Sequence, residues 1–145
     1  MAGIVDLATL LSQMSPQLGD REYVFASVEP AEASRYLALD PLGFFREAEG
    51  LTLILERGVA ESHALAASAP MRCITLTVHS SLEAVGLTAA IATELARRGI
   101  SANVVAAYHH DHVFVPSGQA EQALAALATL RSRSDKPAEQ AGPVT

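Results

Sequence analysis

The fold is decided by residues 72–131, RCITLTVHSSLEAVGLTAAIATELARRGISANVVAAYHHDHVFVPSGQAEQALAALATLR. The segment CITLTVHS (73–80) alternates apolar and polar side chains and is rich in β-branched residues, so we expect a strand. The segment VGLTAAIATELARRG (85–99) repeats apolar residues at helical spacing and ends in two arginines followed by Gly99, which is typical of a helix C-terminus. The stretch therefore opens with a strand followed by a helix.

The remainder of this stretch predicts two more strands and a second helix. ISANVVAAYHH (100–110) and HVFVP (112–116) are β-rich and close enough for a hairpin that turns around His110 and Asp111. QAEQALAALATLR (119–131) places alanines and leucines at helical spacing. The order strand, helix, strand, strand, helix supplies five of the six elements of a ferredoxin-like βαββαβ sandwich.

The first half of the chain repeats this pattern in a weaker form. EYVFASV (22–28) and GLTLILE (50–56) predict strands, and VAESHALAA (59–67) predicts a helix. At a constant offset of 60 residues, the segment 51–64 aligns with 111–124, and both read as a strand, a glycine and a helix. This shared order favours an internal duplication.

The segment 29–49, which joins the first two strands, is interrupted by two prolines and a glycine, which argues against a full crossover helix. Residues 4–12 predict a separate N-terminal helix. The C-terminal residues have no apolar periodicity and are typical of a disordered tail. We therefore divide the chain into a degenerate half with the N-terminal helix (1–69), a second half (70–131) and the tail (132–145).

Each half lacks one strand of the six-element pattern, and an unpaired sheet edge favours aggregation. We therefore expect strand exchange between the halves. Either the strand 72–79 closes the first sheet as well as opening the second, or the strand 22–28 crosses into the second sheet.

Composition excludes several classes of function. The chain has 145 residues and a formal net charge of −6, so it lacks the basic surface that binds nucleic acid. No apolar run approaches the ~20 residues that span a bilayer, and residues 1–11 lack the basic start of a signal peptide. The lone Cys73 cannot form an internal disulfide. We expect a cytoplasmic globular protein that binds neither nucleic acid nor membrane.

The segment HSSLEAVGLTAAI (79–91) is the candidate ligand-binding loop. It follows a strand, carries Ser80, Ser81 and Glu83, and opens a helix through Gly86. A helix N-terminus leaves backbone N–H groups without partners and suits a carboxylate or phosphate, which glycine allows to approach closely. Ordinary helix capping by one of the serines explains the same residues, and the sequence leaves both interpretations open.

The segment LTVHSSLEAVGLTAAIATELARRGISANVVAAYHHDHVFVP (76–116) resembles an ACT domain, a small-molecule-sensing module of amino-acid metabolism. With REAEGLTLILE (46–56), it resembles a family of small proteins of uncharacterised function built from two ACT-like halves. It is more distantly similar to the tandem ACT modules of cytosolic arginine sensors. The resemblance covers residues 5–131 and implies an α+β fold of two tandem ferredoxin-like sandwiches with antiparallel sheets.

The resemblance also implies a site. In typical ACT domains an Asp-x-Pro-Gly motif after the first strand binds an amino acid through its backbone amides and its acid. Here Glu83 stands at the Asp position, Val85 at the Pro and Gly86 at the Gly, with Leu87 next. Glu83 would accept hydrogen bonds from the α-ammonium, while the amides near Gly86 bind the carboxylate. The loss of both Asp and Pro departs from the family pattern.

Three further residues join the predicted site. ACT units often bind ligand between paired modules, with the second strand contributing, and Asn103 is the polar interruption of that strand. An exposed asparagine without a ligand explains it equally well. The following hairpin flanks the Gly86 loop in ACT sheets, which implies contacts from His109 and Asp111. Pairing of modules and the frequency of two-fold dimers favour a homodimer.

The segment YHHDH (108–112) offers an alternative site. Three imidazoles and a carboxylate suit Zn²⁺ or Ni²⁺ or could supply a general base. In a strand, however, at best His110 and His112 converge while His109 points the opposite way, which leaves too few ligands for a structural zinc. We therefore predict no metal and no cofactor. The chain also shows no set of nucleophile, base and orienting residue, which argues against an enzyme.

Three functions follow from these features. The leading hypothesis is a non-enzymatic sensor that binds a small amino acid and acts through an unidentified regulated protein or through self-association. The second is a structural or dimerisation module without a ligand. The third is a small metal-dependent enzyme that uses residues 109–112.

Overall fold

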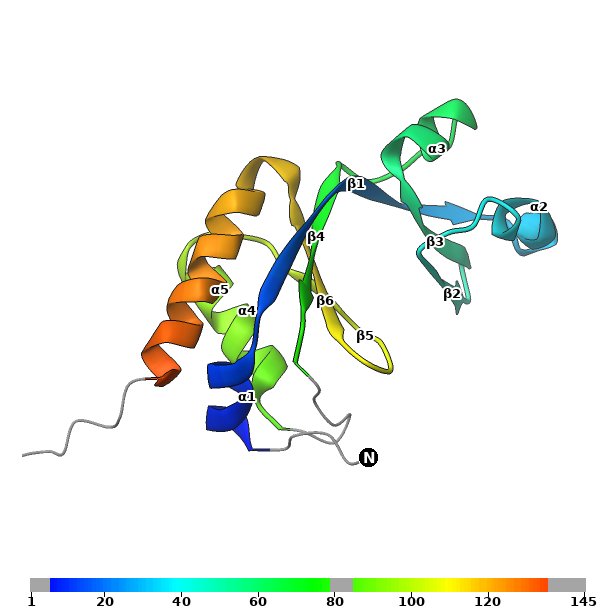
Figure 1. Ribbon diagram of the computed structural model, residues 1–145. Helices are drawn as coiled ribbons and strands as arrows, with labels where there is room; N and C mark the ends of the chain where they lie inside the picture. The colour runs from blue at the N-terminus through cyan, green and yellow to red at the C-terminus, as the bar shows by residue number, and fades with distance from the viewer. Residues whose placement is uncertain (1–5, 79–84, 136–145) are drawn as a thin grey trace, which may run out of the picture.

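The computed structural model describes residues 6–78 and 85–135, and it is an α+β structure (Figure 1). Its elements are α1 (Leu7–Gln13), β1 (Pro16–Val28), the 3₁₀ turn η1 (Pro30–Glu32), α2 (Ala33–Leu37), β2 (Gly43–Glu47), β3 (Gly50–Glu56), α3 (Arg57–Ser62), β4 (Met71–Leu76), α4 (Leu87–Arg97), β5 (Asn103–Ala106), β6 (Asp111–Pro116), the 3₁₀ turn η2 (Ser117–Gln119) and α5 (Ala120–Asp135). The strands form a six-stranded antiparallel sheet in the order β2-β3-β1-β4-β6-β5. The order is symmetrical. The central strands β1 and β4 are the first strands of the two halves, and the hairpins β2–β3 and β5–β6 lie on either side of them.

The expected strand exchange is confirmed, and β1 is the strand that crosses. Its second part, Tyr23–Val28, pairs with β3 of the first half, while its first part, Pro16–Tyr23, pairs with β4 of the second half. The strand begins six residues before the predicted start, and these extra residues make the crossing. The chain before β4 also reaches back, through a bridge between Ala26 and Ala67. The second half thus obtains its missing strand from β1 of the first half (Figure 1), whereas the first half gains only the isolated bridge at Ala67.

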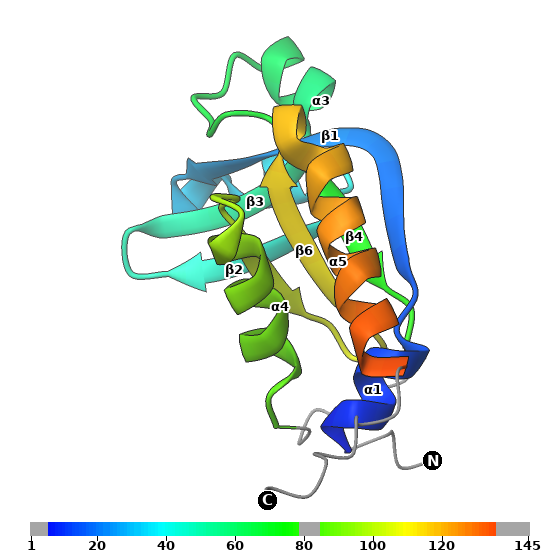
Figure 2. The ribbon, with the colours of Figure 1, turned by 90° about the vertical axis from the view of Figure 1, so that its left-hand side faces the viewer.

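All the helices whose contacts are described lie on one face of the sheet. Against β4 and β6, helices α1, α4 and α5 form the larger core (Figure 2). Against β1 and β3, helices α2 and α3 form a smaller core around Leu53 and Leu55. The N-terminal helix inserts Leu10 and Met14 into the larger core, so it belongs to the second half of the fold. The larger core therefore contains residues from both sides of the predicted boundary at residue 69.

The opposite face, which we call the helix-free face, has a small core of its own. Ile54, Cys73 and Phe114 are buried there, and every residue packed against them comes from a strand. The ring of Phe114 lies edge-on to the rings of Tyr23 and Phe25, with centroids 6.1 and 5.3 Å apart. Because β4 lies between these strands, the rings join the two halves across it.

The other differences from the sequence predictions are local. Strand β2 was missed, because its exposed Phe44 and Phe45 show no alternation. The predicted strand 100–110 shrinks to β5, since Ile100 closes the end of α4 by donating its amide N–H to the carbonyl of Leu95. The predicted helix 59–67 is α3, which is shorter and begins earlier. Helix α5 continues four residues beyond 131, and residues 136–145 of the predicted tail lie outside the described residues.

Glu94 is a buried carboxylate that ties α4 to α5. Its side chain is only 6% exposed and accepts hydrogen bonds from Arg133 at 2.6 Å and from Arg97 and Arg98 at 3.3 Å. The Arg133 hydrogen bond is the main reason that the pKa of Glu94 lies below its usual value, and it outweighs the opposing effect of burial.

We expect Glu94→Gln to lower the free energy of unfolding by about 1–2 kcal/mol at neutral pH, because the charge-assisted bonds are lost while the arginines stay solvated. Because the pKa of Glu94 is lower in the folded protein than its unfolded value of 4.5, the ionised side chain stabilises the fold above pH 4.5. This stabilisation is lost as the pH falls through the pKa that Glu94 has in the folded protein. Urea unfolding at neutral and acidic pH should therefore show the two proteins converging below pH 4.5. Glu121→Gln is the control, since Glu121 is exposed and lies 3.7 Å from Arg72. A constant difference at all pH values would contradict the ion-pair explanation.

Candidate functional site

The β4–α4 corner holds the predicted loop. Gly86 precedes α4 in the left-handed conformation, with φ of 99°, and provides no side chain to cap the helix. Its carbonyl accepts the N–H of Ala90 at 2.9 Å, so the helix begins here with its first amides directed outward. Leu87 is buried and anchors the helix, whereas Val85 is exposed. Ser80, Ser81 and Glu83 lie outside the described residues.

Gly86 is also a point of close approach. A Cβ atom at this position would lie 3.0 Å from Cδ2 of Leu7 in α1, so the N-terminal helix covers one side of the glycine. The positive φ adds a conformational reason for glycine. Any ligand at this corner would therefore enter from the side away from α1.

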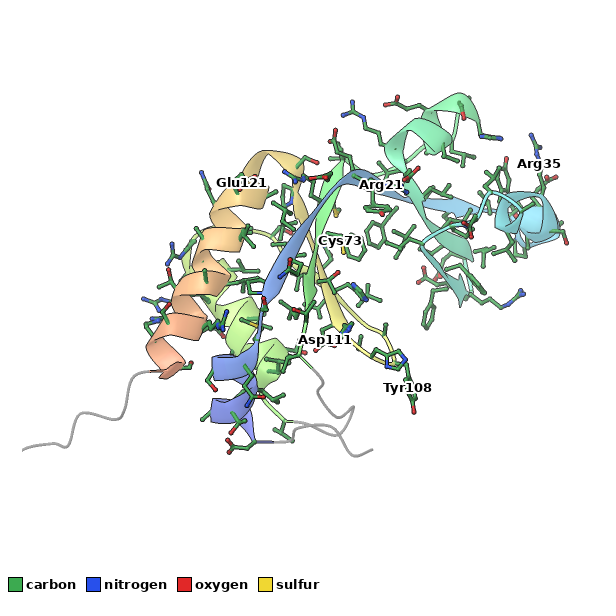
Figure 3. The ribbon with its side chains drawn as sticks, in the orientation of Figure 1. Arg21, Arg35, Cys73, Tyr108, Asp111 and Glu121 are labelled. Atoms are coloured by element: carbon green, nitrogen blue, oxygen red, sulfur yellow. The ribbon has the colours of Figure 1, made fainter. Side chains whose placement is uncertain are left out.

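Asp111 lies at the same end of the sheet as the corner. It pairs with Leu76, the last residue of β4, and with Ala106, the last residue of β5. Burial raises the pKa of Asp111, against the smaller opposing effects of His112 and His110. Figure 3 shows Asp111 at the end of the sheet where α1 lies. His109 stands in the preceding turn, edge-on to Tyr108 with ring centroids 5.0 Å apart.

Asn103 lies away from the corner. It pairs with Phe114 and so faces the helix-free side, at the opposite end of β5 from Ala106. Its Nδ2 is 3.8 Å from Sδ of Met71. Within one chain, the structure therefore brings Asp111 toward the Gly86 corner and leaves Asn103 apart from both.

The histidine segment does not assemble a metal centre in the part of the chain that the structure describes. Among the described residues no group of three or more His, Cys, Asp or Glu side chains could hold an ion. Nδ1 of His112 shares a hydrogen bond of 2.9 Å with Oγ1 of Thr75 and lies 3.9 Å from Sγ of Cys73. Burial lowers the pKa of His112 and raises the pKa of Cys73, so it favours the neutral form of both groups. Nδ1 of His110 is buried and has no hydrogen-bond partner among the described residues.

A hollow lies in the first half, where no site was predicted. It is a cleft of about 340 Å³ whose polar residues are Arg21, Tyr23, Asp40 and Glu56, and we call it the Arg21 cleft. Arg21 stands at a β-bulge of β1, where the pairing with β4 shifts register between Leu18 and Glu22 (Figure 3). The alternating charges of DRE (20–22) inside a strand are a sequence signal for an unusual position at Arg21. They do not reveal the cleft, because Arg21 meets Glu56, which is 35 positions away in sequence.

Comparison with known proteins identifies the family. Sequence models of the ACT domain match residues 2–72 and residues 68–129. This chain belongs to the ACT-domain family. The two matches meet where β4 begins, so the ACT pattern occurs once in each half of the symmetrical sheet.

Solved structures show the same tandem ACT fold. A protein of unknown function from Vibrio cholerae, described as a possible transport protein, is 55% identical, with a TM-score of 0.79 over 86% of this chain and 95% of that chain. A protein from Agrobacterium tumefaciens is 19% identical, with a TM-score of 0.68 over 81% and 89%. The ligand-free regulatory subunit of aspartate kinase from Thermus thermophilus is 10% identical, with a TM-score of 0.59 over 83% and 98%. The last two show the fold alone. No curated protein matches the chain.

No helix in the described ranges has both the length and the apolar character needed to cross a membrane.

Proposed function

We propose that this protein is a non-enzymatic, cytoplasmic sensor that binds a small amino acid at the β4–α4 corner. The observation that carries the proposal is the presence of two ACT modules, which are typically regulatory and bind amino acids. The signal passes to a regulated protein or to self-association, because neither module supplies a catalytic set.

The corner offers complementary groups for the two charges of an amino acid. The first amides of α4 bind the carboxylate, and the left-handed Gly86 lets the ligand approach the backbone. In this proposal Glu83 accepts hydrogen bonds from the ammonium group, and Ser80 and Ser81 are included because the ACT resemblance of the sequence implies them.

The hairpin from β5 to β6 completes this proposed site. Asp111 lies at the same sheet end and adds a second carboxylate, and His109 precedes it in the turn. Asn103 lies on the helix-free face, away from the corner of its own chain. In this proposal it therefore contacts the ligand bound at the corner of the second copy in a homodimer.

A screen of the twenty amino acids by thermal unfolding tests this proposal. We expect one or a few to raise the melting temperature, because a ligand that binds only the folded state adds about 2.7 kcal/mol of stability at one hundred times its Kd. Glu83→Ala should abolish the shift while leaving the unliganded melting temperature unchanged. The matched control is Glu121→Ala, an exposed carboxylate on α5.

The other outcomes separate the alternatives. If no amino acid shifts the melting temperature and the protein forms a concentration-dependent dimer, it is a dimerisation module without a ligand. Stoichiometric metal in protein purified without a histidine tag would instead favour a metal site at residues 109–112.

A further inference from the structure

The Arg21 cleft has the composition of a small-molecule site. Its volume of about 340 Å³ lies at the lower end of the range for ligand pockets, which suits a molecule of amino-acid size. It is bounded by the bulge of β1, the β3–α3 corner and the chain between α2 and β2. Because Tyr23 pairs with Glu56 while Val28 pairs with Leu51, the cleft is at the opposite end of the first-half strands from the β1–α2 loop.

One side of the cleft carries a pair of opposite charges. Nη1 of Arg21 lies 2.5 Å from Oε1 of Glu56, and their side chains are 73% and 40% exposed. Such an exposed pair contributes little to stability, so a ligand opens it at little cost. A zwitterion placed between them replaces one ion pair by two, with its carboxylate on Arg21 and its ammonium group on Glu56.

Two further polar side chains face the same space. Asp40 follows α2 with a positive φ of 56°, and it lines the same cleft as Arg21 and Glu56. Within residues 6–78 and 85–135, no hydrogen bond reaches Oη of Tyr23. Burial raises the pKa of Tyr23, so its hydroxyl stays protonated and can donate a hydrogen bond.

The other side of the cleft is aliphatic. Leu39 and Leu42 come from the chain before β2, while Leu55 and Val59 come from β3 and α3. Leu42 is more than half exposed although it is a large apolar residue, so an aliphatic ligand side chain would bury it. The charged side and the aliphatic side together match an amphiphilic molecule.

The surrounding charges restrict the ligand further. An adjoining groove of about 420 Å³ shares Arg21 and Glu56, and the two hollows together carry five carboxylates and two guanidiniums. The second guanidinium, that of Arg57, already lies 2.9 Å from Glu61 and 3.4 Å from Glu22. This excess of negative charge repels phosphates and dicarboxylates, and it favours a ligand with an ammonium group.

We propose that the Arg21 cleft is a second binding site, specific for an amino acid with an aliphatic side chain such as leucine, isoleucine or valine. Its carboxylate binds Arg21, its ammonium group binds Glu56 and Asp40, and its side chain packs on Leu39 and Leu42. This site is in the first ACT half, away from the β4–α4 corner, and it does not depend on the corner binding a ligand.

Isothermal titration of the whole protein with leucine tests the site. We expect leucine to bind, and N-acetyl-leucine, which lacks the ammonium group, to bind at least tenfold more weakly. Aspartate, which adds a second carboxylate, should bind at least tenfold more weakly as well. Arg21→Gln should weaken leucine binding about tenfold to a hundredfold, because a charge-assisted contact is lost. Arg35→Gln is the matched control, since Arg35 is 65% exposed, pairs with Glu32 at 3.6 Å and lies outside the cleft.

The corner variant separates this site from the one proposed above. Glu83→Ala should leave leucine binding intact, whereas it abolishes binding at the corner. Unchanged leucine affinity in Arg21→Gln, or no leucine binding at millimolar concentration, would overturn the cleft proposal. Loss of leucine binding in Glu83→Ala with its retention in Arg21→Gln would assign leucine to the corner and also overturn it.

Discussion

We expect Phe114→Ala to lower the free energy of unfolding by about 3–5 kcal/mol, the usual cost of truncating a buried aromatic side chain. Phe114 is 1% exposed and is the centre of the small core on the helix-free face. Its edge-on contacts with Tyr23 and Phe25 connect β6 of the second half to β1 of the first. The truncation therefore removes packing that both halves share.

Chemical denaturation followed by circular dichroism measures this loss. Because the ring joins the halves, the variant should also unfold less cooperatively, with two transitions in place of one. Phe45→Ala is the control, since that ring is 72% exposed on β2, and it should change stability by less than about 0.5 kcal/mol. Equal effects of the two substitutions would show that Phe114 does not join the halves.

A second large effect is expected for Leu10→Ala, which should cost about 2–5 kcal/mol. Leu10 is fully buried although it belongs to a short helix close to the N-terminus. It lies in the same core as residues from β4, α4 and α5, and α1 contacts both of these helices. Its removal leaves a cavity in the second half of the fold, more than sixty residues away in sequence.

Hydrogen exchange should place the damage in the second half. We expect amides of β4 and β6 to lose protection in Leu10→Ala, while those of β3 keep it. Leu42→Ala is the control, because Leu42 is a largely exposed leucine of the first half. A stability loss below about 1 kcal/mol for Leu10→Ala would mean that α1 is only loosely attached to the core.

The clearest local patterns predicted their elements well. GLTLILE was predicted as a strand over 50–56, and β3 has these bounds. Helix α4 falls within the predicted 85–99, and the left-handed Gly99 follows it. Strand β6 ends at Pro116 as expected. These features depend on side-chain periodicity and on proline and glycine, which act on the chain within a few residues.

The candidate site was only partly accessible to the same reasoning. Gly86 was singled out, and it does begin α4 in the left-handed conformation. Its contact with Leu7 was not foreseen, because it joins residues 79 positions apart. The Arg21 cleft was missed for the same reason: Arg21 and Glu56 meet only when β1 pairs with β3.

Local sequence patterns were enough to predict the class of fold, the two repeated halves and the resemblance to the ACT family, because each rests on patterns repeated along the chain. Tertiary structure alone decided that β1 serves both halves, that α1 belongs to the second core and that a charged cleft opens beside the β1 bulge. Strand pairing and core packing join residues far apart in sequence, and the charge pattern at residues 20–22 does not reveal which distant residues the bulge brings to Arg21.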